Sequence, residues 1–146
     1  MEMTEAASMA RMLMDRYGLS EWRLDFDRAR RRAGVTKYID HTISLSSLIV
    51  PLCTAEQVRD TVLHEIAHAL VGPECGHGPV WKQMAVMVGA SPRATARDMP
   101  TPPAPWVGLC PEGHRIERFR RPRLSVSCAK CSPHFDKRFQ LRWERR

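Results

Sequence analysis

The pattern that most constrains the fold of this chain is His-Glu-x-x-His, formed by His64, Glu65 and His68. Thr54 precedes it as a good helix N-cap, and a glutamine three residues later completes a capping-box pattern. Apolar side chains then recur at helical spacing, and Gly72 follows the last turn as a common terminator. The segment between Thr54 and Gly72 is therefore predicted to form one amphipathic helix that carries all three motif residues.

The motif places two imidazoles where they can share a metal ion, with one carboxylate beside them. Residues four apart lie on one face of a helix, so His64 and His68 point the same way and can hold one zinc ion. Glu65 is next to the first ligand, within reach of a zinc-bound water, on which it would act as general base. The spacing predicts metal-assisted hydrolysis; the alternative is a chance occurrence of the pattern in an unrelated helix.

A catalytic zinc ion usually takes three protein ligands and keeps its fourth position for water. Three candidates for the third ligand follow the helix. Glu74 lies six residues after His68, which is the metzincin spacing, but that pattern requires a glycine where this chain has Val71. Cys75 would supply a thiolate, which is more typical of a closed structural site. His77 stands between two glycines before a new helix, and we predict it as the third ligand, with Cys75 as the second choice.

Together with the segment Gly76-His77-Gly78-Pro79-x-Trp81, this motif resembles the SprT-like zinc metalloprotease family, which includes the Spartan branch. The segments Ala33–Val35 and Ile43–Ser46 are similar to strands of that family, and the resemblance runs from about Trp22 to Cys131. It implies an α+β, zincin-like minimal metalloprotease domain with helices packed on a small β-sheet. The zinc ligands that it implies are His64, His68 and His77.

The resemblance also implies a substrate class. Proteins of the Spartan branch cleave proteins that are crosslinked to DNA, and DNA turns on their activity. By this resemblance, the chain is expected to be a zinc metallopeptidase that acts on protein substrates, associates with DNA and serves DNA repair.

Charge is distributed unevenly along the chain, whose formal net charge is +7. Residues 1–106 contain twelve basic and twelve acidic side chains, whereas residues 107–146 contain eleven basic and four acidic ones. A short basic segment favours a polyanionic partner, most simply single-stranded or mixed DNA. A solvated, arginine-rich surface is the alternative. The candidate contacts, which surround Phe119, are Arg118, Arg120, Arg121 and Arg123.

A proline-rich stretch marks the clearest boundary in the sequence, because dense proline forms a stiff, extended connection. We predict a metalloprotease domain over residues 1–99, a linker over 100–106 and a basic zinc-ribbon-like module over 107–146. A chain of 146 residues has room for one domain with a proper core and a small appendage.

The second module carries two pairs of potential zinc ligands, a C-x-x-x-H pair and a C-x-x-C pair. Forty residues with few large apolar side chains need a structural metal, so we predict a second zinc ion here. Residues 115–126 are expected to form the strands between the two pairs, and His134 competes for the fourth position. The predicted ligands are Cys110, His114, Cys128 and Cys131.

Other candidate residues lie before and after the motif helix. The basic run from Arg28 to Arg32 lacks interleaved aromatic residues, so a solvated bend is favoured over a phosphate contact near the cleft. Tyr38 and His41 lie between two predicted strands; a surface position is favoured over a role in stabilising a transition state. Trp81 is expected to pack beneath the metal site.

Two other function classes remain open: a non-enzymatic nucleic-acid-binding protein whose zinc ions are structural, and a zinc hydrolase acting on something other than protein. No membrane span and no signal pattern are found, so we expect a cytoplasmic protein with no membrane partner. The chain has 19 arginines but 4 lysines. This bias hints at a high-GC genome, and therefore at a bacterial or viral intracellular setting. The oligomeric state is not predicted.

Overall fold

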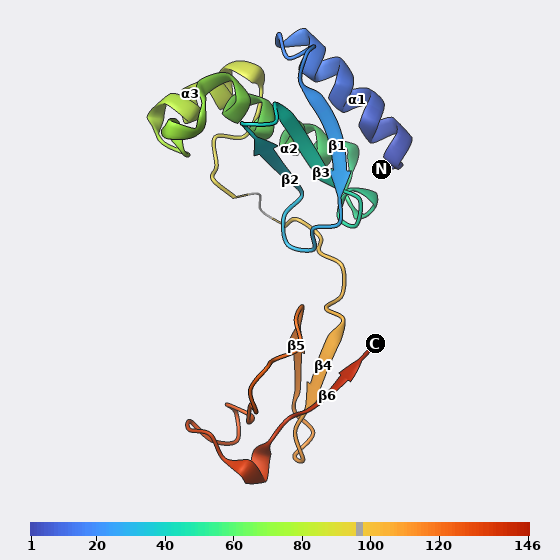
Figure 1. Ribbon diagram of the computed structural model, residues 1–146, viewed down its shortest axis with the longest axis vertical. Helices are drawn as coiled ribbons and strands as arrows, with labels where there is room; N and C mark the ends of the chain where they lie inside the picture. The colour runs from blue at the N-terminus through green and yellow to red at the C-terminus, as the bar shows by residue number, and fades with distance from the viewer. Residues whose placement is uncertain (96–97) are drawn as a thin grey trace. The chain divides into compact units, whose positions relative to one another are not determined.

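The computed structural model describes residues 1–95 and 98–146. Contacts divide the chain into two units, Met1–Pro102 and Pro103–Arg146. Within the described residues there are three α-helices and two three-stranded sheets, so the architecture is α+β as predicted (Figure 1). None of the helices in these ranges has the length and apolar character that a membrane crossing requires.

The first unit contains all three helices and one sheet. Its helices are α1 (Met3–Arg16), α2 (Ala55–Val71) and α3 (Pro79–Val88), and its strands are β1 (Arg23–Asp27), β2 (Gly34–Lys37) and β3 (Thr42–Ser46). Short 3-10 turns, η1 (Val50–Leu52) and η2 (Pro73–Cys75), precede and follow α2.

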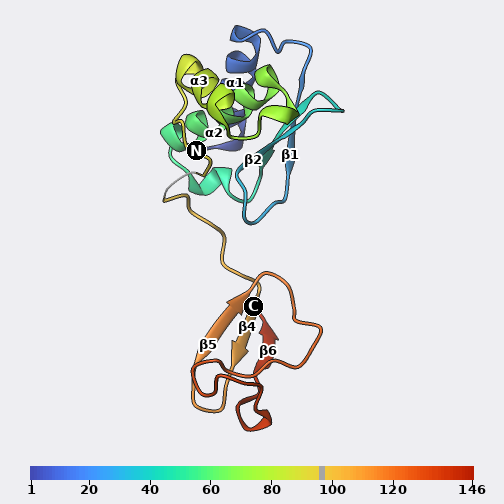
Figure 2. The ribbon, with the colours of Figure 1, turned by 90° about the vertical axis from the view of Figure 1, so that its left-hand side faces the viewer.

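The sheet has the order β1-β3-β2, with β3 parallel to β1 and antiparallel to β2. Every residue of the central strand β3 is buried. The helices lie on one side of this sheet (Figure 2), where α1 contacts β1 and α2 contacts both β2 and β3. Because β2 is an edge strand that also packs against α2, the motif helix lies directly beside the sheet edge.

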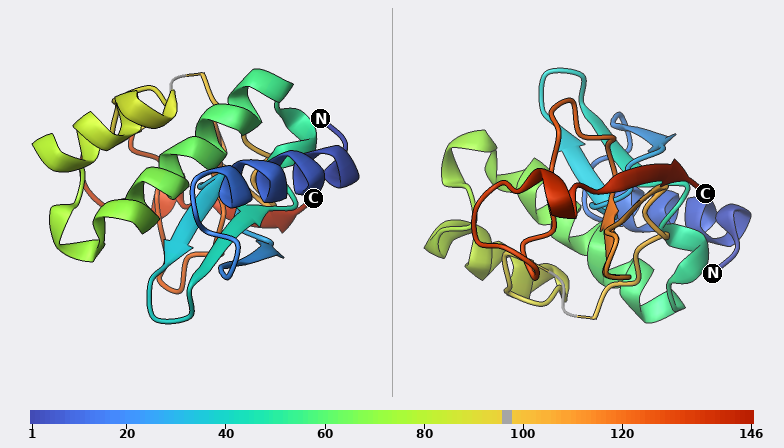
Figure 3. Two further views of the ribbon diagram at one scale, coloured as in Figure 1. Left: turned by 90° about the horizontal axis from the view of Figure 1, so that it is seen from above. Right: turned by 90° about the horizontal axis from the view of Figure 1, so that it is seen from below.

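The predicted motif helix is confirmed as α2. The Thr54 hydroxyl accepts from the Gln57 N–H, and the Gln57 side chain accepts from the Thr54 N–H, which completes the capping box. At the other end, Gly72 has a φ of 90°, which a glycine adopts without strain. Helices α1 and α2 run side by side (Figure 3), and their facing apolar side chains form the core with β3.

The second unit is built from β4 (Trp106–Leu109), β5 (Arg115–Arg118) and β6 (Arg142–Arg145), with β4 between the other two. The prediction that residues 115–126 supply the strands is wrong beyond Arg118, because β4 pairs on its other side with β6. Pro122 lacks the N–H that a ladder needs. Gly108, in contrast, leaves room for Trp143 of β6, whose ring a Cβ would meet at 2.9 Å.

Candidate active site and metal centres

Three imidazoles converge at the junction of α2 and α3. Helix α2 supplies His64 and His68 one turn apart, and His77 comes from the turn after η2, just before Pro79 begins α3. The Nε2 atom of His77 lies 2.9 Å from that of His68 and 3.2 Å from that of His64. The structure thus brings the three predicted ligands together, and neither alternative for the third ligand belongs to the group.

The donor set fits a zinc ion. Two ligand nitrogens at 2.0–2.1 Å from a tetrahedral ion lie about 3.3 Å apart, close to the Nε2 separations observed here. Burial and the neighbouring histidines lower the pKa values of His64 and His68 to about 4, so both rings are neutral near pH 7. The buried Nδ1 of His68 has no hydrogen-bond partner among the described residues. The polar interactions of this ring are therefore confined to the three-histidine group.

Trp81 forms the floor of the histidine group, as expected. Its ring is completely buried, and its centroid lies 4.6, 5.2 and 4.8 Å from those of His64, His68 and His77. Its indole Nε1 donates to the carbonyl of His64 at 3.4 Å. Helix α3 therefore supports all three imidazoles through the ring of Trp81.

Glu65 is buried between α2 and the edge strand, with an exposed fraction of 7%. The hydroxyl of Thr36 on β2 lies 2.6 Å from Oε2 of Glu65 and 3.0 Å from its carbonyl oxygen. Burial raises the pKa of Glu65, while the hydrogen bond from Thr36 and the charge of Arg32 act in the opposite direction. Sequence reasoning missed Thr36, because nothing in the local pattern around it points to a residue 29 positions away.

Gly34 explains how the edge strand comes so close to α2. A Cβ at this position would lie 3.0 Å from Cγ2 of Thr61, 3.2 Å from Cγ of Glu65 and 3.3 Å from Cδ2 of Leu45. Only a glycine therefore lets β2 approach the helix without displacing these side chains. That approach places Thr36 within hydrogen-bonding distance of the Glu65 carboxylate.

A cavity of about 320 Å³ joins these groups, and we call it the histidine cavity. It is lined by the three histidines, Glu65, Tyr38 and residues 34–36 of β2, among others. Burial raises the pKa of Tyr38, as do the nearby charges of Glu65 and Cys75. Tyr38 thus lies nearer the centre than expected, whereas His41 stacks on Trp22 at 4.8 Å and does not line this cavity.

A second cavity, of about 240 Å³, adjoins the first, and we call it the arginine cavity. Gly34, His64 and Glu65 line both cavities. Arg28, Arg31 and Arg32 of the basic run are exposed, which agrees with the interpretation of a solvated bend. Arg31 and Arg32 also line the arginine cavity.

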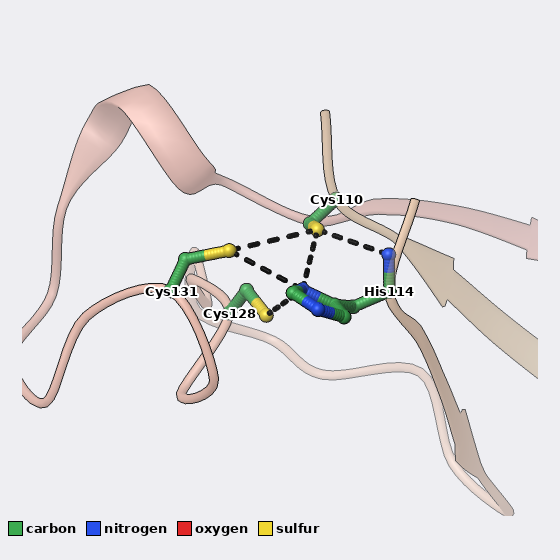
Figure 4. Close-up of side chains that lie close together, drawn as sticks. All are labelled: Cys110, His114, Cys128 and Cys131. Atoms are coloured by element: carbon green, nitrogen blue, oxygen red, sulfur yellow. Dashed lines mark hydrogen bonds between the residues drawn. The ribbon is translucent and has the colours of Figure 1, made fainter. Parts of the chain in front are cut away.

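The second unit brings the four predicted ligands of its metal site together (Figure 4). Nδ1 of His114 lies 3.4, 3.4 and 3.3 Å from the sulfurs of Cys110, Cys128 and Cys131, and Sγ of Cys110 lies 3.9 Å from that of Cys131. His134 does not belong to this group.

These distances also fit a tetrahedral zinc ion, in which two thiolates at 2.3 Å lie about 3.8 Å apart. Burial and the neighbouring thiols raise the pKa of Cys131 to about 12. The cluster therefore disfavours several thiolates at once unless a cation balances their charge. The donor set is that of a closed structural site.

The four arginines predicted to contact nucleic acid are all exposed. Arg118 ends β5, and the other three lie in the segment that follows it. The guanidinium of Arg121 lies 5.4 Å from the ring centroid of Trp106, and that of Arg145 lies 5.9 Å from it. Trp106 and Arg145 were not singled out from the sequence, because only the pairing of β4 with β6 brings them together.

Comparison with known proteins identifies one family over the first part of the chain. No curated protein matches the chain. The model of the SprT-like family, in contrast, matches residues 6–100, a range that contains the motif helix, the third histidine and the whole first sheet. Membership of this family is consistent with a metallopeptidase. The chain belongs to the SprT-like family.

Proposed function

We propose that the chain is a zinc-dependent metalloendopeptidase whose first unit is a minimal zincin-like domain. The observation that carries this proposal is the convergence of three imidazole Nε2 atoms beside a buried carboxylate in one cavity. His64, His68 and His77 would hold the ion. When bound, zinc supplies a Lewis acid that polarises a carbonyl and lowers the pKa of water.

Glu65 has the position and environment of a general base. Its carboxylate takes the proton from the attacking water and passes it to the leaving nitrogen. The Thr36 hydroxyl holds Oε2 in place, which fixes the direction of that transfer. Tyr38 presents a phenol to the same cavity. The edge of β2 offers backbone groups to an extended substrate chain, which is a common way to bind a peptide.

The second unit is proposed to be a zinc-ribbon-like module that binds DNA. Cys110, His114, Cys128 and Cys131 would hold a structural zinc ion, and the exposed arginines supply the positive surface. Trp106, flanked by Arg121 and Arg145, adds an aromatic group to that surface. Family membership and this surface together favour DNA-bound or DNA-crosslinked proteins as substrates, in an intracellular, cytoplasmic setting.

The test is cleavage of a DNA-bound basic protein by zinc-loaded wild type and by Glu65→Gln, each with and without single-stranded DNA. We expect Glu65→Gln to keep its zinc and to lose at least about 100-fold in rate, because it removes only the base. A variant with Arg118, Arg120, Arg121 and Arg123 changed to Gln should bind DNA more weakly and lose the activation by DNA.

Each other outcome of this test leads to a different conclusion about the function of the chain. Cleavage that needs Glu65 but not DNA keeps the peptidase and discards the DNA switch. A fully active Glu65→Gln protein contradicts the assigned base. DNA binding that is indifferent to Glu65, with no cleavage by zinc-loaded protein, favours a non-enzymatic nucleic-acid-binding protein.

A further inference from the structure

The arginine cavity borders the proposed catalytic centre. It shares Gly34, His64, Glu65 and Ala94 with the histidine cavity, so a group bound in it lies beside the proposed general base. A peptide whose reacting carbonyl is in the histidine cavity can therefore place a neighbouring side chain in the arginine cavity. Its position makes it a candidate for the pocket that selects the substrate.

The lining of this cavity is largely apolar, and the cationic groups among its described residues are arginines. Ala33, Gly34, Ala94 and Met99 supply apolar surface, and Arg31 and Arg32 supply two guanidinium groups. Among the described residues that line the cavity, Glu65 is the single acid. The lining therefore combines an apolar wall with an excess of positive charge.

Arg32 is exposed, but an ion pair holds its guanidinium on one side. Its Nη1 lies 3.0 Å from Oδ2 of Asp27, an oxygen that also accepts from the Ser44 hydroxyl at 2.7 Å. The other oxygen of Asp27 accepts from the N–H of Ala29 at 2.9 Å. This anchored guanidinium is close enough to the centre to lower the pKa of Glu65. A substitution of Arg32 would also disturb Asp27 and the bend that it holds, so Arg31 is the residue to vary.

We propose that the arginine cavity is a specificity subsite for an acidic side chain, glutamate or aspartate, next to the scissile bond. This inference rests on the proposed peptidase function. A glutamate would lay its methylene groups on the apolar wall and direct its carboxylate to the guanidinium groups, which bind carboxylates well. The volume of the arginine cavity is about 240 Å³. Typical small-molecule sites have about 300–1,000 Å³, so this cavity suits one side chain better than a nucleotide.

The test begins with the zinc-loaded 146-residue chain and a peptide mixture that is randomised at every position. Mass spectrometry of the products, with single-stranded DNA present and absent, identifies the residues that flank the cleaved bonds. Matched quenched peptides with Glu, Gln or Lys at the selected position then give kcat/KM. We expect glutamate to be preferred over glutamine by roughly 10- to 100-fold, because a charge-assisted pair is lost.

Charge variants then identify the cavity as the source of the preference. Arg31→Gln should reduce the ratio of Glu to Gln peptides, and Arg31→Glu should invert the preference toward lysine. Arg28→Gln is the matched control, since Arg28 belongs to the same basic run, is exposed and does not line the cavity. Its peptide preference should equal that of wild type.

Four results would overturn the inference, and they differ from one another. Cleavage without acidic preference leaves the peptidase intact and removes the subsite. An equal rate loss for all peptides in Arg31→Gln means that Arg31 acts on the centre and not on specificity. Weaker DNA binding with unchanged preference assigns the cavity to phosphate. No cleavage of any peptide or protein removes the proposed function itself.

Discussion

At the scale of single residues, the least predictable feature of the site is the environment of its carboxylate. Glu65 is buried, which favours its protonated form, yet the hydroxyl of Thr36 donates to it at 2.6 Å and favours the ionised form. A general base must be ionised before it can accept a proton. Under the proposed mechanism, Thr36 is therefore a positioning residue that acts through Glu65.

We predict that Thr36→Val will raise the pKa of Glu65 further, because the hydrogen bond that favours the carboxylate is lost while burial remains. The acid limb of the profile of kcat/KM against pH should then move to higher pH. Leaving the buried acceptor unpaired should also cost about 1–3 kcal/mol in the free energy of unfolding near neutral pH. Thr36→Ser, which keeps the hydroxyl, serves as the control, and equal profiles for both variants would contradict the assignment.

The residues of the site differ in how far the sequence reveals them. His64, Glu65 and His68 follow from helical spacing alone, and ligand chemistry favours His77 over its two neighbours. Thr36 could not be predicted, because its bond to Glu65 depends on how an edge strand packs on a helix. Sequence spacing carries no information about such packing. For the same reason a position of Arg31 and Arg32 near the cleft was only the less favoured interpretation of the basic run.

At the scale of elements, the site depends on how closely β2 packs on α2. Gly34 is the point of closest approach, and its φ lies outside the left-handed region, so space rather than backbone conformation requires a glycine. Alanine elsewhere in a strand gains about 0.5–1 kcal/mol over glycine. Here the contact of 3.0 Å with Thr61 opposes that gain.

We predict that Gly34→Ala will lower the free energy of unfolding by roughly 1–3 kcal/mol, the usual range for overpacking. It should also reduce activity, because separating β2 from α2 lengthens the bond between Thr36 and Glu65. Thr61→Ser removes the methyl group that is nearest to the new Cβ. The double variant should therefore recover part of both losses in chemical unfolding and in kcat/KM, with Thr61→Ser alone as the control.

Strictly additive effects of Gly34→Ala and Thr61→Ser would contradict the close contact.

The secondary-structure elements, like the residues, were predictable from the sequence only in part. Alternation and caps indicated β1, β2, β3 and the helices, but not the parallel pairing of β1 with β3. In the second unit, pairing with β6 replaced the strand expected after Arg118, since the sequence pattern does not specify which segments pair.

At the scale of the whole molecule, the two units draw stability from different sources. The first unit has a core of buried side chains from all three helices and β3. The second has a small core cluster of Cys110, Cys128 and Leu141, and two of these are candidate metal ligands. A small core of this kind depends on its metal ion.

We predict that zinc removal will unfold residues 103–146 while Met1–Pro102 stays folded. In limited proteolysis of the whole chain, a chelator should then cause release of the intact first unit. Without the chelator the chain should resist cleavage. Cys128→Ser should cause the same release without a chelator and lower the zinc content from two ions to one. Cys75→Ser, which alters a cysteine outside both metal groups, should behave as wild type. A protease-resistant Cys128→Ser protein with two zinc ions would contradict a structural site.

The position of Trp81 also has an optical consequence. Its indole lies within 5.2 Å of all three imidazole centroids and is sealed from solvent. Its fluorescence should therefore respond to protonation of the histidines and to binding of a metal ion, since both change the charge beside the indole ring. The difference in emission between wild type and Trp81→Phe isolates this signal from the other tryptophans. Occupancy of the three-histidine centre can thus be followed in real time, with neither substrate nor DNA present.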